Sequence, residues 1–230
     1  MRYQTINKFR KTHRFLGIFI GIQFLFWTIS GLYFSWTDID EIHGDHYLKG
    51  PQELIFNSLI SVDSVENRTE IDLKKLELKA IGKTPYYWIN DSLLFNAING
   101  KKQNQISEET AKEVIRAYVL EEYQIEKIAY IDTVSKQDEY RGRPLPAYKV
   151  WLTGKGNPIA YVSAKDGKFQ RIRHSRWRWF DFLWMTHTMD YEGRDDFNKI
   201  TLRIFSLLGL ITVLSGFALA FVTSTMRTKQ

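Results

Sequence analysis

Two long apolar segments frame a more polar middle region of this chain. No charged side chain occurs at residues 15–36, and none occurs between Arg203 and Arg227. A helix rises about 1.5 Å per residue, so ~20 apolar residues cover the ~30 Å hydrocarbon core of a bilayer. The pattern therefore predicts two transmembrane helices, at residues 15–36 and 200–224, and a lipid bilayer as the first partner.

Basic residues stand at the outer ends of both segments. Residues 1–14 contain five lysines and arginines and no acidic residue, and the tail at residues 225–230 adds two more basic residues. Basic flanks favour the cytoplasm. We expect a multi-pass protein of a bacterial inner membrane, with both termini cytoplasmic and its main domain periplasmic or extracellular. The first segment is too long for a usual signal peptide and no cleavage pattern follows it, which predicts an uncleaved signal anchor.

The middle region has the mixed pattern of an α+β domain. Ser107 precedes apolar residues at helical spacing, namely Ala111, Val114, Ile115 and Tyr118. Alternating runs then continue to residue 172, separated by the turn signals "GKGNP" and "KDGK". We expect residues 105–172 to form a helix, a strand, a hairpin and a last strand.

Residues 37–104 resemble a weaker copy of that unit. The stretch "NAINGK" at 96–101 corresponds to "SAKDGK" at 163–168, and "IDLKKLELKAIG" would supply a short helix-to-strand part. Because turns of this kind are common, a chance match of two hairpins is the alternative. The expected architecture is two transmembrane helices flanking an extracytoplasmic domain at 37–172, single or tandem.

Aromatic and arginine side chains are dense in residues 173–199, just before the second apolar segment. Indole rings prefer the membrane interface and guanidinium groups can bind lipid phosphates. We therefore expect an interfacial segment whose membrane contacts are Trp177, Trp179, Trp184, Arg176 and Arg178. Small residues let helices approach closely, and we expect packing between the two spans at Gly17, Gly21, Gly31, Gly209 and Gly216.

Charge and cysteine content exclude several classes of function. The net charge is +6, but all acidic residues lie between Asp38 and Asp196, and the basic excess sits at the chain ends rather than on the domain. This distribution argues against nucleic-acid binding. The absence of cysteine excludes disulfides, thiolate metal sites, iron–sulfur clusters and covalent c-type haem.

Four stretches, in this order, resemble the PepSY-associated transmembrane family. They are "THRFLGIFIGIQFLFWTISGLYF", the run "ISEETAKEVI … YKVWL … IAYVSAKDGKFQRI", "LWMTHTMDY" and "LLGLITVLSGFAL". The resemblance implies an inner-membrane protein with an outward PepSY domain. Larger relatives have four spans, and some bind haem through span histidines and reduce ferric siderophores. This chain has two predicted spans, and its second contains no histidine.

Histidines are the candidate cofactor ligands, because neutral imidazole binds haem and metals well. His13 and His187 are the candidate axial ligands of a haem b, but they should lie at opposite membrane faces, ~30 Å apart. One chain cannot therefore place both on one haem, whereas a homo-oligomer or a partner protein could complete the pair. The alternative is a polar flank for His13 and an interfacial polar residue for His187.

His43 and His46 in "HGDH" are the candidate metal ligands. Positions i and i+3 share a helix face and can chelate a divalent ion, with His187 approaching from the same membrane side. Gly44 disfavours a regular helix, so a solvated linker is the alternative.

Three functions remain open from the sequence. The first is an accessory protein or subunit in iron and siderophore acquisition or membrane electron transfer, within an oligomer or larger membrane complex. The second is a haem-dependent ferric-siderophore reductase subunit that acts as an oligomer. The third is a PepSY module that binds or inhibits an exported peptidase. No motif of a hydrolase, metalloprotease or nucleotide-binding loop occurs.

Overall fold

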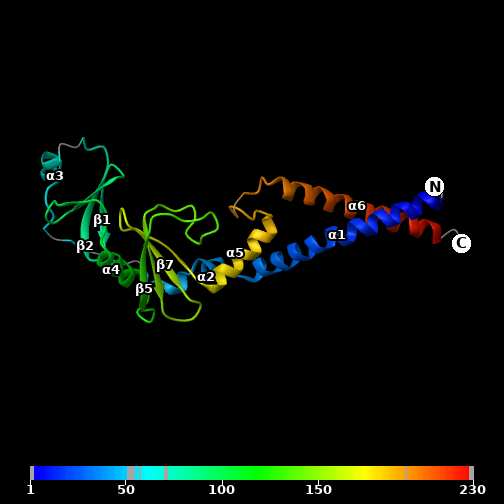
Figure 1. The fold of residues 1–230 in the computed structure, drawn as a ribbon, viewed down its shortest axis with the longest axis horizontal. Helices are drawn as coiled ribbons and strands as arrows, with labels where there is room; N and C mark the ends of the chain where they lie inside the picture. Colours follow the sequence, from blue (N-terminus) through cyan, green and yellow to red (C-terminus); the bar gives the residue numbers. More distant parts are fainter. Residues whose placement is uncertain (1–2, 51–54, 57, 70–71, 195, 228–230) are drawn as a thin grey trace. The chain divides into compact units, whose positions relative to one another are not determined.

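The computed structural model describes residues 3–50, 55–56, 58–69, 72–194 and 196–227. The chain divides into two compact units, Met1–Asp38 with Trp179–Gln230, and Ile39–Arg178. We call them the helical unit and the sheet unit and describe each by itself (Figure 1). The protein is α+β, with two apolar helices that could span a membrane and two antiparallel sheets, which confirms these parts of the predicted architecture.

The helical unit consists mainly of two long helices, α1 (Tyr3–Trp36) and α6 (Ile200–Arg227), which pack against each other. The last part of α5 (Ser175–Thr188) also belongs to this unit. In the most apolar window of each long helix only 17% and 11% of the residues are buried. The core helix of a soluble protein would be mostly buried, so this exposure of apolar side chains is compatible with contact to lipid.

Two glycines of α6 form the close contact between the long helices. A Cβ atom at Gly209 would lie 2.8 Å from Phe24 Cζ and 3.9 Å from Ile20 Cγ2, and one at Gly216 would lie 3.3 Å from His13 Cε1. The contacts are seven residues apart on both helices, so His13 lies opposite Gly216 and Ile20 opposite Gly209. This is the two-turn repeat of closely packed helices.

The glycines of α1 differ from the expectation. No atom lies within 4 Å of a Cβ built at Gly17, Gly21 or Gly31. Gly21 is rotated by roughly 80° from the line of contact, at 3.6 residues per turn, so α6 does not reach it. In the register of the two helices Gly31 lies opposite residue 198, before α6 begins.

The sheet unit begins with short helices and a first antiparallel sheet. The helices are α2 (Ile39–His43), the 3-10 turn η1 (Asp45–Tyr47) and α3 (Val62–Thr69). The sheet has the order β1 (Leu76–Ile81), β2 (Thr84–Ile89), β3 (Leu93–Asn96) and β4 (Lys102–Gln103). The helix of this copy therefore precedes residue 71, where the sequence suggested its start, and residues 76–81 form a strand.

A second helix and sheet follow in the same order. They are α4 (Glu108–Tyr118), β5 (Ile125–Ile131), β6 (Ala147–Leu152), β7 (Ile159–Ser163) and β8 (Phe169–Arg173), again an antiparallel sheet in sequence order. The side chain of Ser107 accepts a hydrogen bond from Thr110 N at 3.1 Å and caps α4. The predicted order of helix, strand, hairpin and strand is present.

The same backbone hydrogen bonds close the last turn of both copies. In the first copy they run from Asn96 N to Lys101 O, from Ala97 N to Pro85 O and from Gly100 N to Asn96 O; in the second they run from Ser163 N to Lys168 O, from Ala164 N to Pro146 O and from Gly167 N to Ser163 O. Both turn glycines have positive φ, 72° and 63°. A chance match of two turn sequences would not repeat the bond to the preceding strand.

In both copies the same hydrogen bonds join the segment before the helix to the sheet. Ile60 N donates to Ala97 O, and Ile106 N donates to Ala164 O. The hydroxyl of Tyr87 donates to Ile60 O at 2.7 Å, and that of Tyr148 donates to Ile106 O at 3.0 Å. The sheet unit is therefore a structural tandem, which favours duplication over a chance match.

Replacing Tyr87 and Tyr148 with phenylalanine tests this equivalence. Each change removes one hydroxyl that holds the segment before a helix, and we expect each to lower stability by about 1 kcal/mol. Thermal unfolding of the two variants measures the effect. A loss at one position with no loss at the other would show that the two tyrosines are not equivalent.

One hydrophobic core joins the two copies. It contains Ile81 and Trp88 of the first sheet, Val114 of α4, and Val150 and Ile172 of the second sheet. A smaller core lies within the first copy, and a third lies on the opposite face of the second sheet, under Tyr140.

An ion pair and a close contact lock the copies together beside this shared core. Lys79 Nζ lies 2.9 Å from Asp166 Oδ2, and Gly167 packs directly on Ile81. Burial opposes ionisation of Asp166, but hydrogen bonds from Lys79 and Ser163 outweigh it and lower its pKa.

Candidate functional site

His187 is held against the C-terminal part of α1. Its Nδ1 lies 2.7 Å from the hydroxyl of Ser30, and its carbonyl accepts a hydrogen bond from Trp27 Nε1 at 2.8 Å. The ring of Phe34 contacts the imidazole edge-on, with 5.7 Å between ring centroids. A polar group inside this aromatic surrounding needs a hydrogen-bond partner, and Ser30, which is fully buried, provides it.

The hydrogen bonds of Ser30 determine which nitrogen of His187 carries the proton. The hydroxyl has one proton, which it donates to Phe26 O at 2.7 Å. With its proton directed at Phe26 O, Ser30 accepts a hydrogen bond from His187, and in a neutral ring this corresponds to the tautomer with its proton on Nδ1. Nε2 keeps its lone pair, the arrangement that a ligand imidazole requires.

His13 repeats this arrangement near the N-terminal part of α1. Its Nδ1 lies 2.7 Å from Ser215 Oγ, and that hydroxyl donates to Thr212 O at 2.8 Å. The same bonding pattern corresponds, for a neutral ring, to the tautomer of His13 with its proton on Nδ1 and a lone pair on Nε2. Gly216 gives the ring its room, because a side chain there would meet the imidazole.

The two imidazoles do not fit one haem within a single chain. His13 and Ser30, the partner of His187, both lie on α1 and are 17 positions apart. At 1.5 Å per residue this is ~25 Å along the helix, whereas the two axial ligands of a haem lie on opposite sides of one ring. His13 and His187 of one chain therefore cannot be the two axial ligands of the same haem.

The predicted metal pair His43 and His46 is divided by a break in the helix. Gly44, with φ of +91°, ends α2, and a Cβ there would collide with Ile172. Both imidazoles are exposed, and the described residues contain no cluster of three or more histidines and carboxylates able to hold a metal ion. The rings beside His46 are those of Tyr47 and His174, at 4.2 and 5.3 Å between centroids.

His174, to which the sequence assigned no role, is a buried structural residue. It is 1% exposed, and its Nε2 donates to Glu41 O at 3.1 Å and to Ile42 O at 3.2 Å, which ties β8 to α2. Burial, more than the nearby charge of His46, lowers the pKa of His174.

Stability of the sheet unit is expected to fall as the pH falls below about 6.5, the pKa of histidine in an unfolded chain. Below this pH the unfolded chain binds a proton at residue 174, whereas the buried imidazole of the folded protein does not. The free energy of unfolding therefore decreases as the pH falls from 6.5 toward the lower pKa of His174 in the folded protein. Thermal melts at pH 7.5 and pH 5.5 measure the slope. In His174→Gln the slope should be shallower, and an unchanged slope would assign the effect to another group.

The predicted membrane-interface residues divide between the two units. Trp177 is 7% exposed, so its ring faces protein rather than lipid, and this expectation has to be revised. In the sheet unit, Arg176 pairs with Glu41, and Arg178 pairs with Glu139 at 2.6 Å. Membrane contact by Arg176 and Arg178 thus remains a prediction, with each charge already paired within the protein.

Trp179 and Trp184 belong to the helical unit. Trp179 is 53% exposed, and Trp184 packs on Phe34 and Phe197. The exposure of Trp179 and the contact of Trp184 with α1 are compatible with an interfacial position, which stays a prediction.

The two serines that orient the histidines were not singled out by sequence reasoning. Ser30 and Ser215 each donate to a carbonyl three or four residues earlier in their own helix, a common arrangement for a serine inside an apolar helix. The available signal was a hydroxyl in each apolar segment, because polar groups inside a span usually have a partner.

Comparisons with protein-family models, with curated proteins and with solved structures find no match to this chain.

Proposed function

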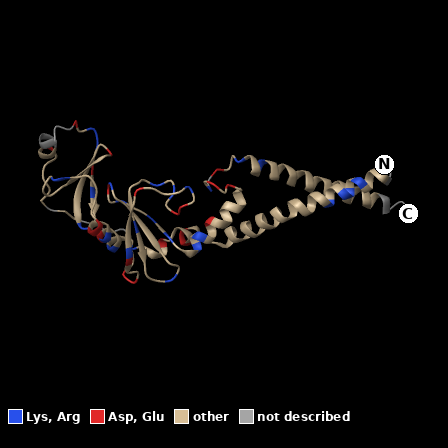
Figure 2. Cartoon of the chain, viewed as in Figure 1, with Lys and Arg blue, Asp and Glu red and all other residues tan. Residues whose placement is uncertain are grey.

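We propose that this chain is an inner-membrane protein that crosses the bilayer twice, through α1 and α6, with both termini in the cytoplasm. Figure 2 shows the basic residues gathered near the N-terminal end of α1, while the rest of the helix is almost free of charge. Arg10, Lys11 and Arg14 favour the cytoplasmic side. This topology places the sheet unit in the periplasm or outside the cell.

The sheet unit is, in this proposal, a tandem of PepSY-type modules. Its repeated hydrogen bonds support two copies of one unit. The proposal that these copies are PepSY modules is based on the sequence resemblance. The function is that of an accessory protein or subunit in iron and siderophore acquisition or membrane electron transfer.

One observation carries the accessory role. His13 and His187, the histidines associated with the long helices, are docked on serines ~25 Å apart along α1. A single chain thus cannot form the bis-histidine haem that a self-contained reductase of this kind would need.

Growth of a deletion strain tests this function. We expect slow growth when a ferric siderophore is the sole iron source, normal growth with ferrous iron, and rescue by the full chain. Rescue should persist with His13→Ala and with His187→Ala if the chain is an accessory protein. A deletion strain with no iron-dependent defect would contradict the proposal.

A second function, a haem-bearing reductase subunit that acts as an oligomer, is favoured by the free Nε2 lone pairs of His13 and His187. The visible spectrum of detergent-purified protein, expressed with haem supplied, distinguishes the two functions. The accessory role predicts no Soret band. A Soret band that disappears in His187→Ala or His13→Ala, and not in the exposed control His43→Ala, would favour the oligomeric reductase.

A further inference from the structure

The face of the second sheet that points away from α4 carries buried polar atoms without partners. We call Tyr161, Arg171, Arg173, Trp177 and Tyr140 the β7–β8 cluster. Tyr161 on β7 is directly opposite Arg171 on β8. Among the described residues, the hydroxyl of Tyr161 and the Nε atoms of Arg171 and Arg173 are buried with no hydrogen-bond partner.

Arg173 is the member of the cluster whose burial is least favourable for folding. It is 8% exposed, its guanidinium lies 4.0 Å from the centre of the Trp177 ring, and its Nη1 donates to the carbonyl of its neighbour Ile172 at 3.3 Å. Arg173 forms no ion pair with any residue in the described part of the chain. A buried cation without an anion is strongly unfavourable. Burial, followed by repulsion from Arg141 and Arg143, lowers the pKa of Arg173 to about 10.

The nearest carboxylates are engaged elsewhere. The negative charge of Glu139 raises the pKa of both Arg173 and Tyr161. Its carboxylate, however, is bound by Arg178, through Nε at 2.6 Å and Nη2 at 3.3 Å. Asp138 Oδ1 accepts a hydrogen bond from Tyr140 N at 2.7 Å. The cluster therefore has donors and positive charge in excess of the acceptors that face it.

We propose that the β7–β8 cluster binds a phosphate group. A guanidinium and a phenol hydroxyl are donors suited to an oxyanion, and three unpartnered donors match a phosphate better than the two oxygens of a carboxylate. The phosphate comes either from a free phosphate compound or from the headgroup of an anionic lipid. This site goes beyond the proposed function, since it needs neither haem nor iron.

Access to the site requires the segment that covers it to move. Tyr140 stacks on Tyr161, with 4.7 Å between ring centroids, and closes the cluster from outside. The segment is tied down by the pair of Glu139 with Arg178 and by a 3.4 Å hydrogen bond from Arg171 Nη1 to Glu139 O. The phosphate enters when these two ties open, which frees Arg178 from the carboxylate of Glu139 and Arg171 from its carbonyl.

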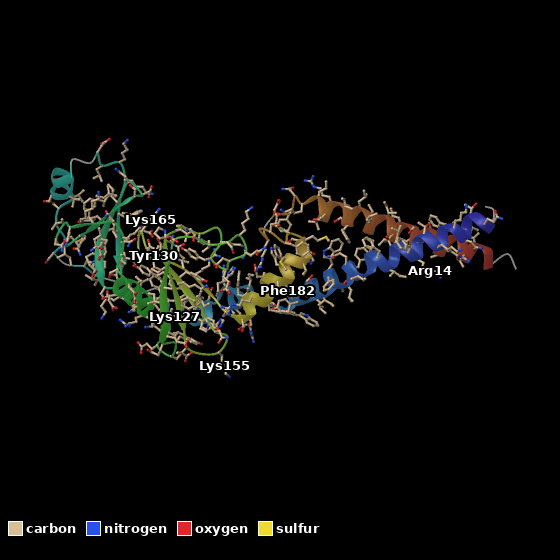
Figure 3. All side chains as sticks on the ribbon, viewed as in Figure 1. Arg14, Lys127, Tyr130, Lys155, Lys165 and Phe182 are labelled. Atoms are coloured by element: carbon tan, nitrogen blue, oxygen red, sulfur yellow. The ribbon has the colours of Figure 1, made fainter. Side chains whose placement is uncertain are left out.

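Titration of the full-length protein in detergent with inorganic phosphate, followed by calorimetry, tests the site. We expect Arg173→Gln to weaken binding by about tenfold or more and Tyr161→Phe by roughly fivefold. The matched control is Lys165→Gln, because Lys165 is an exposed cation on the turn between β7 and β8 (Figure 3) and should not change binding.

Tyr161→Phe also separates binding from folding. Without phosphate this variant should be at least as thermostable as the unmodified protein, because it removes a buried hydroxyl that has no partner. Tyr161→Phe therefore still tests the phosphate site if Arg173→Gln fails to fold. A lower melting temperature without phosphate would mean that the hydroxyl has a structural partner, and would count against the site.

Lipid nanodiscs identify the source of the phosphate. Free phosphate is left out, and the protein is compared in discs of phosphatidylcholine alone and in discs with added phosphatidylglycerol. Arg173-dependent stabilisation by phosphatidylglycerol, without binding of inorganic phosphate, assigns the lipid headgroup, and binding of inorganic phosphate assigns a free compound. The proposal is overturned if neither inorganic phosphate nor phosphatidylglycerol binds, or if Arg173→Gln and Tyr161→Phe both bind as tightly as the unmodified protein. Either outcome is independent of the iron-growth test.

Discussion

Replacing Gly167 with alanine is expected to destabilise the sheet unit by about 3 kcal/mol, since a strained backbone and an overpacked core each cost ~1–3 kcal/mol. Gly167 has φ of +63°, a conformation that residues with a Cβ rarely adopt. The added Cβ would collide with Ile81 Cγ2 and lie 2.9 Å from Ile81 Cδ1. Ile81 belongs to the core that joins the two copies, so it has little freedom to move aside. Thermal or urea unfolding of the purified protein measures the loss.

Gly142→Ala is the matched control. Gly142 has a similar φ of +69°, but a Cβ added there would have no atom within 4 Å, so backbone strain alone should cost about 1 kcal/mol. In an Ile81→Ala background, Gly167→Ala should cost no more than this control. Equal losses for Gly167→Ala and Gly142→Ala in the unmodified background would contradict the close contact between the copies.

Asp190→Asn is expected to loosen the loop before α6 and to cost about 2 kcal/mol at neutral pH. The carboxylate of Asp190 is fully buried and accepts hydrogen bonds from the backbone N–H groups of Glu192, Gly193 and Asp196, at 3.3, 3.2 and 3.0 Å. Burial alone would raise the pKa of Asp190, but these donors and Lys199 outweigh it and lower the pKa to about 2. Asparagine keeps the shape but loses the charge that these donors favour.

The sign of the pH dependence follows from the lowered pKa. The contribution of Asp190 is complete above about pH 4, where an unfolded aspartate is ionised, and it is lost as the pH falls toward 2. Protease cleavage in residues 189–199 at pH 7 measures the opening of the loop, and melting at pH 7 and pH 3 measures the pH dependence. Asp132→Asn, at an exposed carboxylate, should change neither, and equal cleavage of both variants would contradict the role of Asp190.

Much of the fold could be predicted because its signals are local. The apolar run of α1, the capping serine of α4 and the glycine turn before β8 each depend on neighbouring residues, and all three occur as expected. The first copy was harder to recognise, because α3 is short and its pattern is weak. Its equivalence to the second copy depends on hydrogen bonds between strands, such as that from Ala97 to Pro85.

The candidate site could be predicted only in part. His13 and His187 were found as polar residues next to apolar segments, and their separation followed from helix length. The serines that fix their proton positions could not be identified, because the pairing of residue 30 with residue 187 depends on how α5 returns against α1. For the same reason Trp177 was expected at the membrane, whereas it is buried with the guanidinium of Arg173 over its ring.

The sequence by itself determined the two apolar helices, the basic residues at their outer ends and the α+β pattern of residues 105–172 between them, because periodicity and charge are properties of consecutive residues. Only the tertiary structure decided that Gly209 and Gly216 rather than Gly17 and Gly21 carry the helix contact, and that Arg173 is buried without an anion. The physical reason is that close approach and burial depend on which distant segment packs on a residue, and hydrophobic pattern alone does not specify that partner.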